Sequence, residues 1–169
     1  MRLKGLHSLE LELEPLAIIA AAEDYARVAA SRIELTAEQS RWSDELLSLA
    51  AVFDASFAPT VPCHNDLVAS NVVDDGELWL VDFEYAASSA PILDLAGLAG
   101  LNDYDAAQRA RLIAAYYGGE RVPFGTEQLD AAIRLVRLLA YFWVLAYGGR
   151  QVVSSGADGF AAAMAAMLR

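Results

Sequence analysis

Two stretches before residue 60 repeat apolar side chains near helical spacing. Residues 15–33 are predicted to form the first helix, because Pro15 suits a first helical turn and apolar residues recur along one side. The second helix is predicted to start at Thr36, since Gln39 can complete a capping pair with it. The apolar face of this second helix is formed by Leu46, Leu49, Ala50 and Phe53. The pattern therefore predicts a pair of helices early in the chain.

A β-hairpin is predicted after Pro59 and Pro62, which end the helical region and favour extended backbone. Residues 72–73 and 78–83 are short runs rich in β-forming side chains. Between them, Gly76 can adopt the positive φ that tight hairpin loops require.

Everything after Pro91 is predicted to be helical. The expected helices cover residues 92–101, 103–117 and 126–147, and an alanine-rich segment from Asp158. The glycine pairs 118–119 and 148–149 are the expected stops. The pattern thus predicts a single domain, residues 1–169, that is mainly α with a small β-hairpin (an α+β fold).

Composition narrows the class of partner. The chain has 169 residues, 56% of them hydrophobic, and a net charge of −11 from 12 basic and 23 acidic residues. Nucleic acid is not expected as a partner, because phosphate binding needs clustered Lys and Arg. The charge permits a cationic substrate, although a solvated acidic surface that aids solubility accounts for most of these groups.

Cysteine content and hydropathy give two further expectations. Cys63 is the only cysteine, so no disulfide or zinc cluster is expected, and a buried structural thiol is the favoured interpretation. The amino terminus lacks a signal-peptide core, and the longest apolar stretch, residues 135–147, contains Arg137 and is short for a membrane span. No membrane association and a cytoplasmic location are therefore expected.

Candidate chemistry lies in a D-x-x-x-x-N frame formed by Asp66 and Asn71, followed by Asp82 on a predicted strand. Phosphoryl transfer needs these groups: a carboxylate to orient the attacking hydroxyl, then an amide and a second carboxylate to hold magnesium. Turn formation and helix capping are the alternative roles of Asp66 and Asn71. The complete spacing favours the phosphoryl-transfer interpretation.

Residues 63–95 resemble the catalytic core of the aminoglycoside phosphotransferase and choline kinase superfamily, the small-molecule branch of the protein-kinase-like fold. The matching elements are His64-Asn65-Asp66-Leu67 to Asn71, Val81-Asp82-Phe83-Glu84-Tyr85-Ala86, and Asp94-Leu95-Ala96. Their order and type are especially close to the choline/ethanolamine kinase group. The resemblance implies a carboxy-terminal kinase lobe, with ATP as co-substrate and Mg²⁺ as cofactor.

The same resemblance implies a role for each motif residue. Asp66 is the expected catalytic base, and Asn71 and Asp82 are the expected metal ligands. His64 and Asn65 are expected to support the catalytic loop.

Two later residues, Asp94 and Glu84, also have expected roles. Asp94 resembles an aspartate that braces the catalytic loop and caps a helix, and a local N-cap is expected of it. Glu84 stands where protein kinases have glycine and, on an extended strand, would point to the same side as Asp82. It could contact metal-bound water or a cationic substrate, or serve as a surface or salt-bridge residue.

Residues 138–147 resemble the late helix of choline kinases, where tryptophans help to enclose a quaternary ammonium. Trp143 falls on the first family tryptophan, whereas Ala146 stands where a second often occurs, which puts choline specificity in doubt. Tyr141 and Trp143 are candidate substrate-binding residues; an ordinary core role is the alternative for both and the favoured one for Phe142.

The resemblance therefore implies a domain made of a catalytic loop (63–71), a metal-binding strand (78–84) and substrate helices (92–169). Leu3-Lys4-Gly5-Leu6-His7 resembles the Leu-x-x-Leu-His segment just after the hinge between kinase lobes. No Gly-rich loop or strand lysine precedes it, so the nucleotide-binding amino-terminal lobe is expected to be absent, through truncation, degeneration or supply by another polypeptide.

The expected function is ATP-dependent phosphorylation of a small-molecule hydroxyl, on a choline- or ethanolamine-like amino alcohol or an aminoglycoside, with little activity from this chain alone. The alternative is a non-catalytic binding module, or truncated pseudokinase, that recognises a cationic metabolite or a partner protein. A metal hydrolase built on His64 and Asp66 lacks the further histidines such a site needs.

Self-association is expected through apolar surface near residues 1–8 and 78–83.

Overall fold

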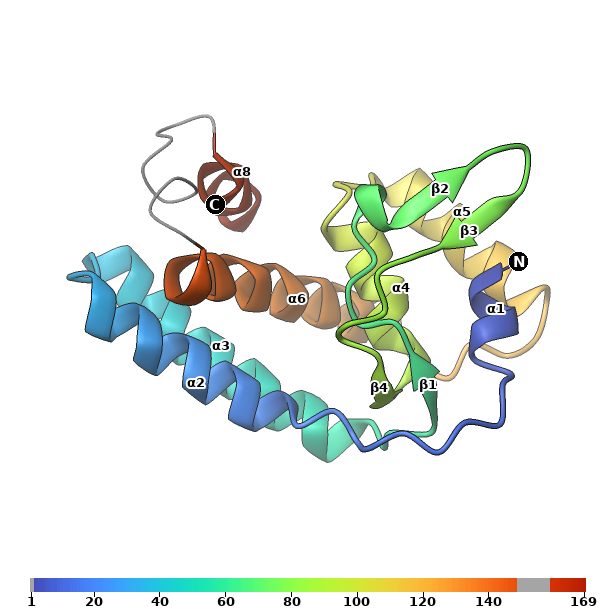
Figure 1. The fold of residues 1–169 in the computed structure, drawn as a ribbon, viewed down its shortest axis with the longest axis horizontal. Helices are drawn as coiled ribbons and strands as arrows, with labels where there is room; N and C mark the ends of the chain where they lie inside the picture. The colour runs from blue at the N-terminus through green and yellow to red at the C-terminus, as the bar shows by residue number, and fades with distance from the viewer. Residues whose placement is uncertain (1, 149–158) are drawn as a thin grey trace. The chain divides into compact units, whose positions relative to one another are not determined.

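The structure is a computed structural model that describes residues 2–148 and 159–169 (Figure 1). Its contacts divide the chain into two compact units: Met1–Leu16 with Phe57–Ile133, and Ala17–Ser56 with Arg134–Arg169. The described part of the second unit is mainly helical, whereas the first combines helices with two small antiparallel sheets. The predicted fold class is confirmed.

The first unit contains both sheets and all the motif residues of the catalytic core. Its elements are α1 (Arg2–Leu6), β1 (Val61–Cys63), the 3-10 helix η1 (Ala69–Asn71), β2 (Val72–Asp74), β3 (Leu78–Leu80), β4 (Ala87–Ser89), α4 (Pro91–Gly100), α5 (Ala106–Tyr117) and the first part of α6 (Thr126–Tyr147).

Each sheet has two antiparallel strands. In the predicted hairpin, β2 pairs with β3 in the register Val73 opposite Trp79, and Gly76 in the turn has φ +101° as expected. The second sheet pairs β1 with β4, a strand that the sequence pattern did not reveal, and places Cys63 opposite Ala87. The extended segment predicted after Pro62 is therefore held by strand pairing, with the catalytic loop directly after it.

Helix ends in this unit follow local capping chemistry. Asp105 accepts a hydrogen bond from the Gln108 backbone N–H at 2.7 Å, and the Gln108 side chain accepts from the Asp105 N–H, so α5 starts with a capping box. Gly118 ends α5 in the left-handed region, at φ +59°, as the predicted glycine stop requires.

The second unit is built from α2 (Ile18–Arg32), α3 (Ala37–Ser56), the rest of α6 and α8 (Phe160–Leu168). Helices α2 and α3 pack together, with Ala22, Ala29 and Leu46 fully buried. Thr36 caps α3 as predicted: its Oγ1 accepts from the Gln39 N–H at 3.2 Å, and the Gln39 side chain accepts from the Thr36 N–H at 2.8 Å.

Two helix starts were predicted wrongly. Helix α5, predicted to start at residue 103, begins at Ala106. Helix α2 begins at Ile18, and Pro15 lies outside it as a bridge partner of Ser88. Proline suits a first helical turn, but it also suits an edge position of a sheet, where no backbone N–H is needed. Here Pro15 pairs with Ser88 and does not start the helix. The bounds predicted for α6 agree with the structure, whereas Gly149 and Asp158 lie outside the described residues.

Within the described residues, none of the helices combines the length and apolarity needed to cross a membrane.

Candidate active site

The predicted catalytic loop (63–71) begins at the last residue of β1, and the carboxylate of Asp94 holds the next two residues. The backbone N–H of His64 donates to Oδ2 of Asp94 at 2.8 Å, and the backbone N–H of Asn65 donates to Oδ1 at 2.7 Å. Asn65 adopts φ +62°, a left-handed conformation that asparagine tolerates better than most residues. Because both N–H groups are fixed, the chain enters Asp66 in a set direction.

Asp94 is 1% exposed in the first turn of α4. The helix cap itself is Ala90, and no side chain caps the helix there. The expectation that Asp94 caps a helix was therefore wrong, and the expectation that it braces the catalytic loop agrees with the contacts. The carboxylate faces loop donors that are distant in sequence, which no local capping pattern can reveal.

A third donor to Asp94 comes from the segment after α1. Nε2 of His7 lies 3.0 Å from Oδ2 of Asp94, and Nδ1 of His7 lies 2.7 Å from the hydroxyl of Tyr116. We call Asp94 and its three donors, His7, His64 and Asn65, the Asp94 hub. The sequence signalled His7 through the Leu-x-x-Leu-His resemblance but did not assign it a contact.

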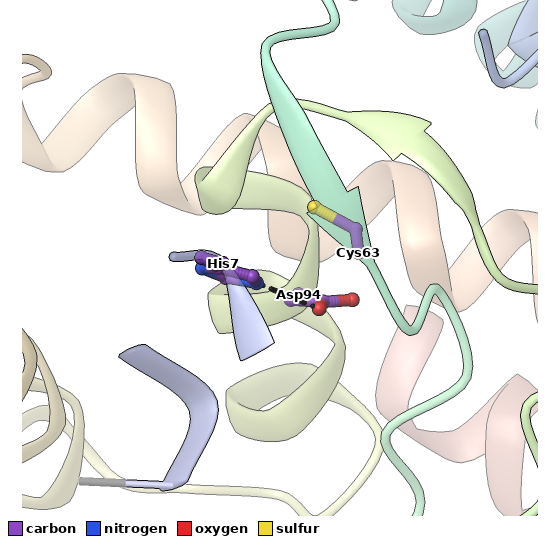
Figure 2. A group of neighbouring side chains, drawn as sticks. All are labelled: His7, Cys63 and Asp94. Carbon is purple, nitrogen blue, oxygen red and sulfur yellow. Dashed lines mark hydrogen bonds and ion pairs between the residues drawn. The ribbon is translucent and has the colours of Figure 1, made fainter. Parts of the chain in front are cut away.

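Figure 2 shows His7, Cys63 and Asp94 together, coming from the segment after α1, from β1 and from α4. Their potential metal-ligand atoms lie within 4.8 Å of one another. Both ring nitrogens of His7 and both oxygens of Asp94 already take part in hydrogen bonds, so hydrogen bonding accounts for the cluster. Burial, with a further contribution from Asp94, raises the pKa of the Cys63 thiol, as expected for a structural cysteine.

The imidazole of His64 is fully buried beneath the loop. Nδ1 accepts a hydrogen bond from the Asp66 backbone N–H at 3.3 Å, so Nε2 carries the hydrogen and donates to the Val81 carbonyl at 2.8 Å. The ring also lies 4.6 Å from that of Phe83. These contacts link the loop to the segment that contains Asp82.

Asn65 makes a second link to that segment. Its Nδ2 donates to the carbonyl of Tyr85 at 3.0 Å and approaches that of Cys63 at 3.4 Å. Its Oδ1 is buried and has no hydrogen-bond partner among the described residues.

The 3-10 helix η1 brings the two ends of the D-x-x-x-x-N frame, Asp66 and Asn71, into contact. Nδ2 of Asn71 donates to the backbone carbonyl and to Oδ2 of Asp66, both at 2.9 Å. Because the amide nitrogen is turned toward Asp66, Oδ1 of Asn71 is directed elsewhere, and its described contact is Ser70 Oγ at 3.4 Å. The frame therefore orients one carboxylate and one amide oxygen together.

The pKa of Asp66 is raised above its ordinary value of 3.8. Burial is the largest cause and the charge of Asp82 adds to it, whereas the hydrogen bond from Asn71 and the electrostatic influence of His64 oppose it. A carboxyl with a raised pKa is a stronger proton acceptor when ionised.

Asp82 does not lie on a strand, which corrects the predicted metal-binding strand 78–84. Strand β3 ends at Leu80, and Asp82 has φ +64° in the left-handed region. The N–H of Val81 donates to the carbonyl of Asn71 at 3.0 Å, so Asp82 directly follows a residue tied to Asn71. Glu84 lies in an exposed turn, and the alternation argument that placed it beside Asp82 fails, because a left-handed residue interrupts the pleat.

Tyr141 and Trp143 belong to α6 in the second unit. Tyr141 is 5% exposed, accepts a hydrogen bond from Gln39 Nε2 at 2.7 Å, and contacts the rings of Trp42 and Phe142 edge-on. It is a core residue. Trp143 is 37% exposed. Residues two apart on a helix face different directions, so Tyr141 and Trp143 do not share one face of α6.

The residues present fit a magnesium ion. Oδ1 of Asn71 and the Asp82 carboxylate are oxygen donors, which Mg²⁺ prefers, and within residues 2–148 and 159–169 no hydrogen bond engages the Asp82 carboxylate. Left-handed aspartates are uncommon and cluster at functional sites, which agrees with this assignment.

The sequence profile of the phosphotransferase enzyme family matches residues 2–132. The chain belongs to this family. Its members are phosphotransferases, and the resemblance to the choline/ethanolamine kinase group is confirmed by ethanolamine kinase 2 of Rattus norvegicus, which is 27% identical over 132 residues.

Solved structures agree with this assignment. A choline/ethanolamine kinase family protein from Mesorhizobium loti superposes with a TM-score of 0.78 at 27% identity, over 98% of this chain. The choline kinase LicA from Streptococcus pneumoniae, in complex with AMP, has the same fold, with a TM-score of 0.74 at 23% identity and 99% of this chain covered.

The chain spans only part of these relatives. It covers 33% of ethanolamine kinase 2, 56% of the Mesorhizobium protein and 59% of LicA.

Proposed function

We propose that this chain carries the hydroxyl-orienting and magnesium-binding groups of an ATP-dependent small-molecule kinase. Asp66 orients the substrate hydroxyl, and Asn71 and Asp82 hold Mg²⁺. The observation that carries the proposal is the double hydrogen bond from Nδ2 of Asn71 to Asp66. It fixes the base and at the same time directs Oδ1 away from it, toward a ligand role.

In this proposal Asp66 accepts the hydrogen of the substrate hydroxyl and aligns its oxygen for in-line attack on the γ-phosphate. Burial raises the pKa of Asp66, which suits a group that takes up this proton as the new P–O bond forms. Bound Mg²⁺ would neutralise phosphate charge. The Asp94 hub acts earlier, by fixing the backbone that presents Asp66, so less reorganisation is needed during transfer.

An amino alcohol related to choline or ethanolamine is the proposed substrate. The names of the relatives support this class, and the net charge of −11 suits a cation. Trp143 is exposed and remains a candidate cation contact, whereas Tyr141 is withdrawn from that role because it is buried and hydrogen-bonded. An aminoglycoside is the second substrate class to test.

The second candidate function is a binding module that acts with another polypeptide. Exposed apolar side chains gather along the hairpin and the segment after it: Val73, Leu78, Trp79, Val81 and Phe83. Leu3, in the predicted amino-terminal part of this surface, is buried. Association through this surface, either with a copy of the chain or with a nucleotide-binding polypeptide, is consistent with little transfer activity from the chain alone. The cytoplasmic location stays a prediction.

A metal titration tests the kinase proposal without requiring turnover. Free Mn²⁺, measured by electron paramagnetic resonance, should fall as the chain is added, and Mg²⁺ should compete. Asp82→Asn should weaken binding at least about tenfold, because an anionic ligand is lost. Asp54→Asn, an exposed carboxylate on α3, is the matched control. Equal weakening in both variants would show diffuse binding to surface charge and contradict the proposal.

A further inference from the structure

The hydrogen-bond chain that holds the catalytic loop continues past the Asp94 hub to Tyr116. This tyrosine lies on α5, outside every motif that the sequence offers. Its side chain is buried, its hydroxyl lies 2.7 Å from Nδ1 of His7, and the two rings meet edge-on at 5.5 Å. Tyr116 therefore touches a residue of the hub without touching Asp66.

The hydrogen positions in this chain follow from its acceptors. The carboxylate of Asp94 accepts the backbone N–H groups of His64 and Asn65, so it also faces His7 as an acceptor. Nε2 of His7 must then carry a hydrogen and donate it across the 3.0 Å separation to Oδ2. In a neutral imidazole the other ring nitrogen, Nδ1, then accepts from the hydroxyl of Tyr116.

The protonation state of Tyr116 agrees with a hydrogen bond donated from its hydroxyl to His7. Burial, more than any neighbouring charge, raises the pKa of Tyr116 to about 12. The phenol thus keeps its hydrogen at neutral pH and can donate it. Hydrogen on Nε2 of His7 satisfies the carboxylate of Asp94, whereas the opposite tautomer would set a bare Nε2 against it.

We propose that Tyr116 is a positioning residue for the catalytic loop: together with Asp94 it fixes the orientation and tautomer of His7, His7 holds Asp94, and Asp94 holds the backbone leading into Asp66. The last link, to Asp66 as base, rests on the proposed function. The earlier links stand on hydrogen bonds alone. They are measured separately below.

The first measurement is the tautomer of His7, from long-range ¹H–¹⁵N correlations in the wild-type chain at neutral pH. Hydrogen on Nε2 with a bare Nδ1 is expected. A hydrogen on Nδ1, whether in the other tautomer or in the imidazolium, would overturn the proposal. This result needs neither metal binding nor a folded variant.

The second measurement compares Tyr116→Phe with Tyr117→Phe. Both remove one hydroxyl from α5 and keep the ring, and the Tyr116–Tyr117 ring contact at 4.8 Å survives in each. Tyr116→Phe should shift the backbone amide resonances of His64 and Asn65 and weaken Mn²⁺ binding about three- to tenfold. Tyr117→Phe should leave both unchanged. Equal responses would assign Tyr116 an ordinary packing role.

A double-variant cycle separates positioning from general structure. His7→Gln keeps an N–H donor that can reach Asp94, but the amide has no tautomers that a hydrogen bond from Tyr116 could select. In that background Tyr116→Phe should produce no further shift at His64 or Asn65. A full additional shift would overturn the proposal. Should the chain prove not to bind Mn²⁺, the proposed function fails while the tautomer and the amide shifts still decide the role of Tyr116.

Discussion

The two sides of the candidate site are built in opposite ways. On one side, Asp94 is 1% exposed and each of its oxygens accepts at least one hydrogen bond from the loop or from His7. On the other side, Asp82 is exposed, sits in a left-handed conformation and follows a strand of three residues. Asp94 is thus buried and hydrogen-bonded, whereas Asp82 is exposed and has a left-handed backbone that costs free energy.

The difference assigns a task to each side. Groups that must not move, such as the backbone before Asp66, are tied to a buried carboxylate whose donors lie about 30 and 90 residues away in the chain. Asp82, the proposed ligand of a soluble ion, is exposed. Substitutions on the first side should therefore affect folding, and those on the second should affect binding.

The largest expected effect is that of Asp94→Ala. It would leave three buried N–H donors without their acceptor, so the free energy of unfolding should fall by about 3–5 kcal/mol. Urea denaturation measures this value, with Asp54→Ala on the surface of α3 as control. A loss below about 1 kcal/mol would mean that the hub does not support the fold.

Asn71→Ala should affect both sides. Removing the amide deprives Asp66 of two hydrogen bonds at 2.9 Å, and a loss of about 1–3 kcal/mol of unfolding free energy is expected. Mn²⁺ binding should weaken as well, because Oδ1 is lost. Ser40→Ala, an exposed residue on α3, is the control. Weakened binding without any loss of stability would contradict the dual role of this side chain.

Asp82→Gly should raise the free energy of unfolding, in contrast to Asp94→Ala and Asn71→Ala. Glycine adopts φ +64° without strain, so the free energy of unfolding should rise by about 0.5–1 kcal/mol. Metal binding should be lost in the same variant. Thermal denaturation and Mn²⁺ titration on one sample give both numbers. A destabilised variant would show that the Asp82 carboxylate supports the fold rather than a ligand.

The smallest expected effect is a pH dependence caused by Asp66. Its folded-state pKa lies above the ordinary 3.8, so the folded chain holds the proton more tightly than the unfolded chain. The free energy of unfolding contributed by this group is therefore highest below 3.8 and falls as pH rises through the folded pKa. Asp66→Asn should remove this decrease. Its stability relative to wild type should increase with pH, and a constant difference across urea titrations from pH 3 to pH 7 would refute the assignment.

Local chemistry explains which features the sequence predicted well. The capping pair of Thr36 and Gln39, the glycine at position 76 and the stop at Gly118 depend on neighbours within a few residues, and each appears as expected. The D-x-x-x-x-N frame is equally local, since η1 brings Asn71 back onto Asp66.

The features that were missed depend on distant contacts. Asp94 was expected at a helix cap because first-turn aspartates often act there, yet its donors come from β1 and from the segment after α1. The left-handed backbone of Asp82 follows from contacts to the catalytic loop that no alternation pattern records. Tyr141 was predicted by analogy with an aromatic wall, but Gln39 of α3 holds its hydroxyl in the core.

The most direct test of the central claim is a map of paramagnetic broadening. Mn²⁺, added in small amounts to the ¹⁵N-labelled chain, should broaden the amide resonances of Asp66, Asn71 and Asp82 first, since broadening depends steeply on distance from the ion. The exposed turn at Asp74 and Asp75, only a few residues away and also acidic, is the internal control. Early broadening centred on residues 66, 71 and 82 is the predicted result. Broadening that starts at residues 74–75, or spreads evenly over acidic surface, would contradict the assignment of this site.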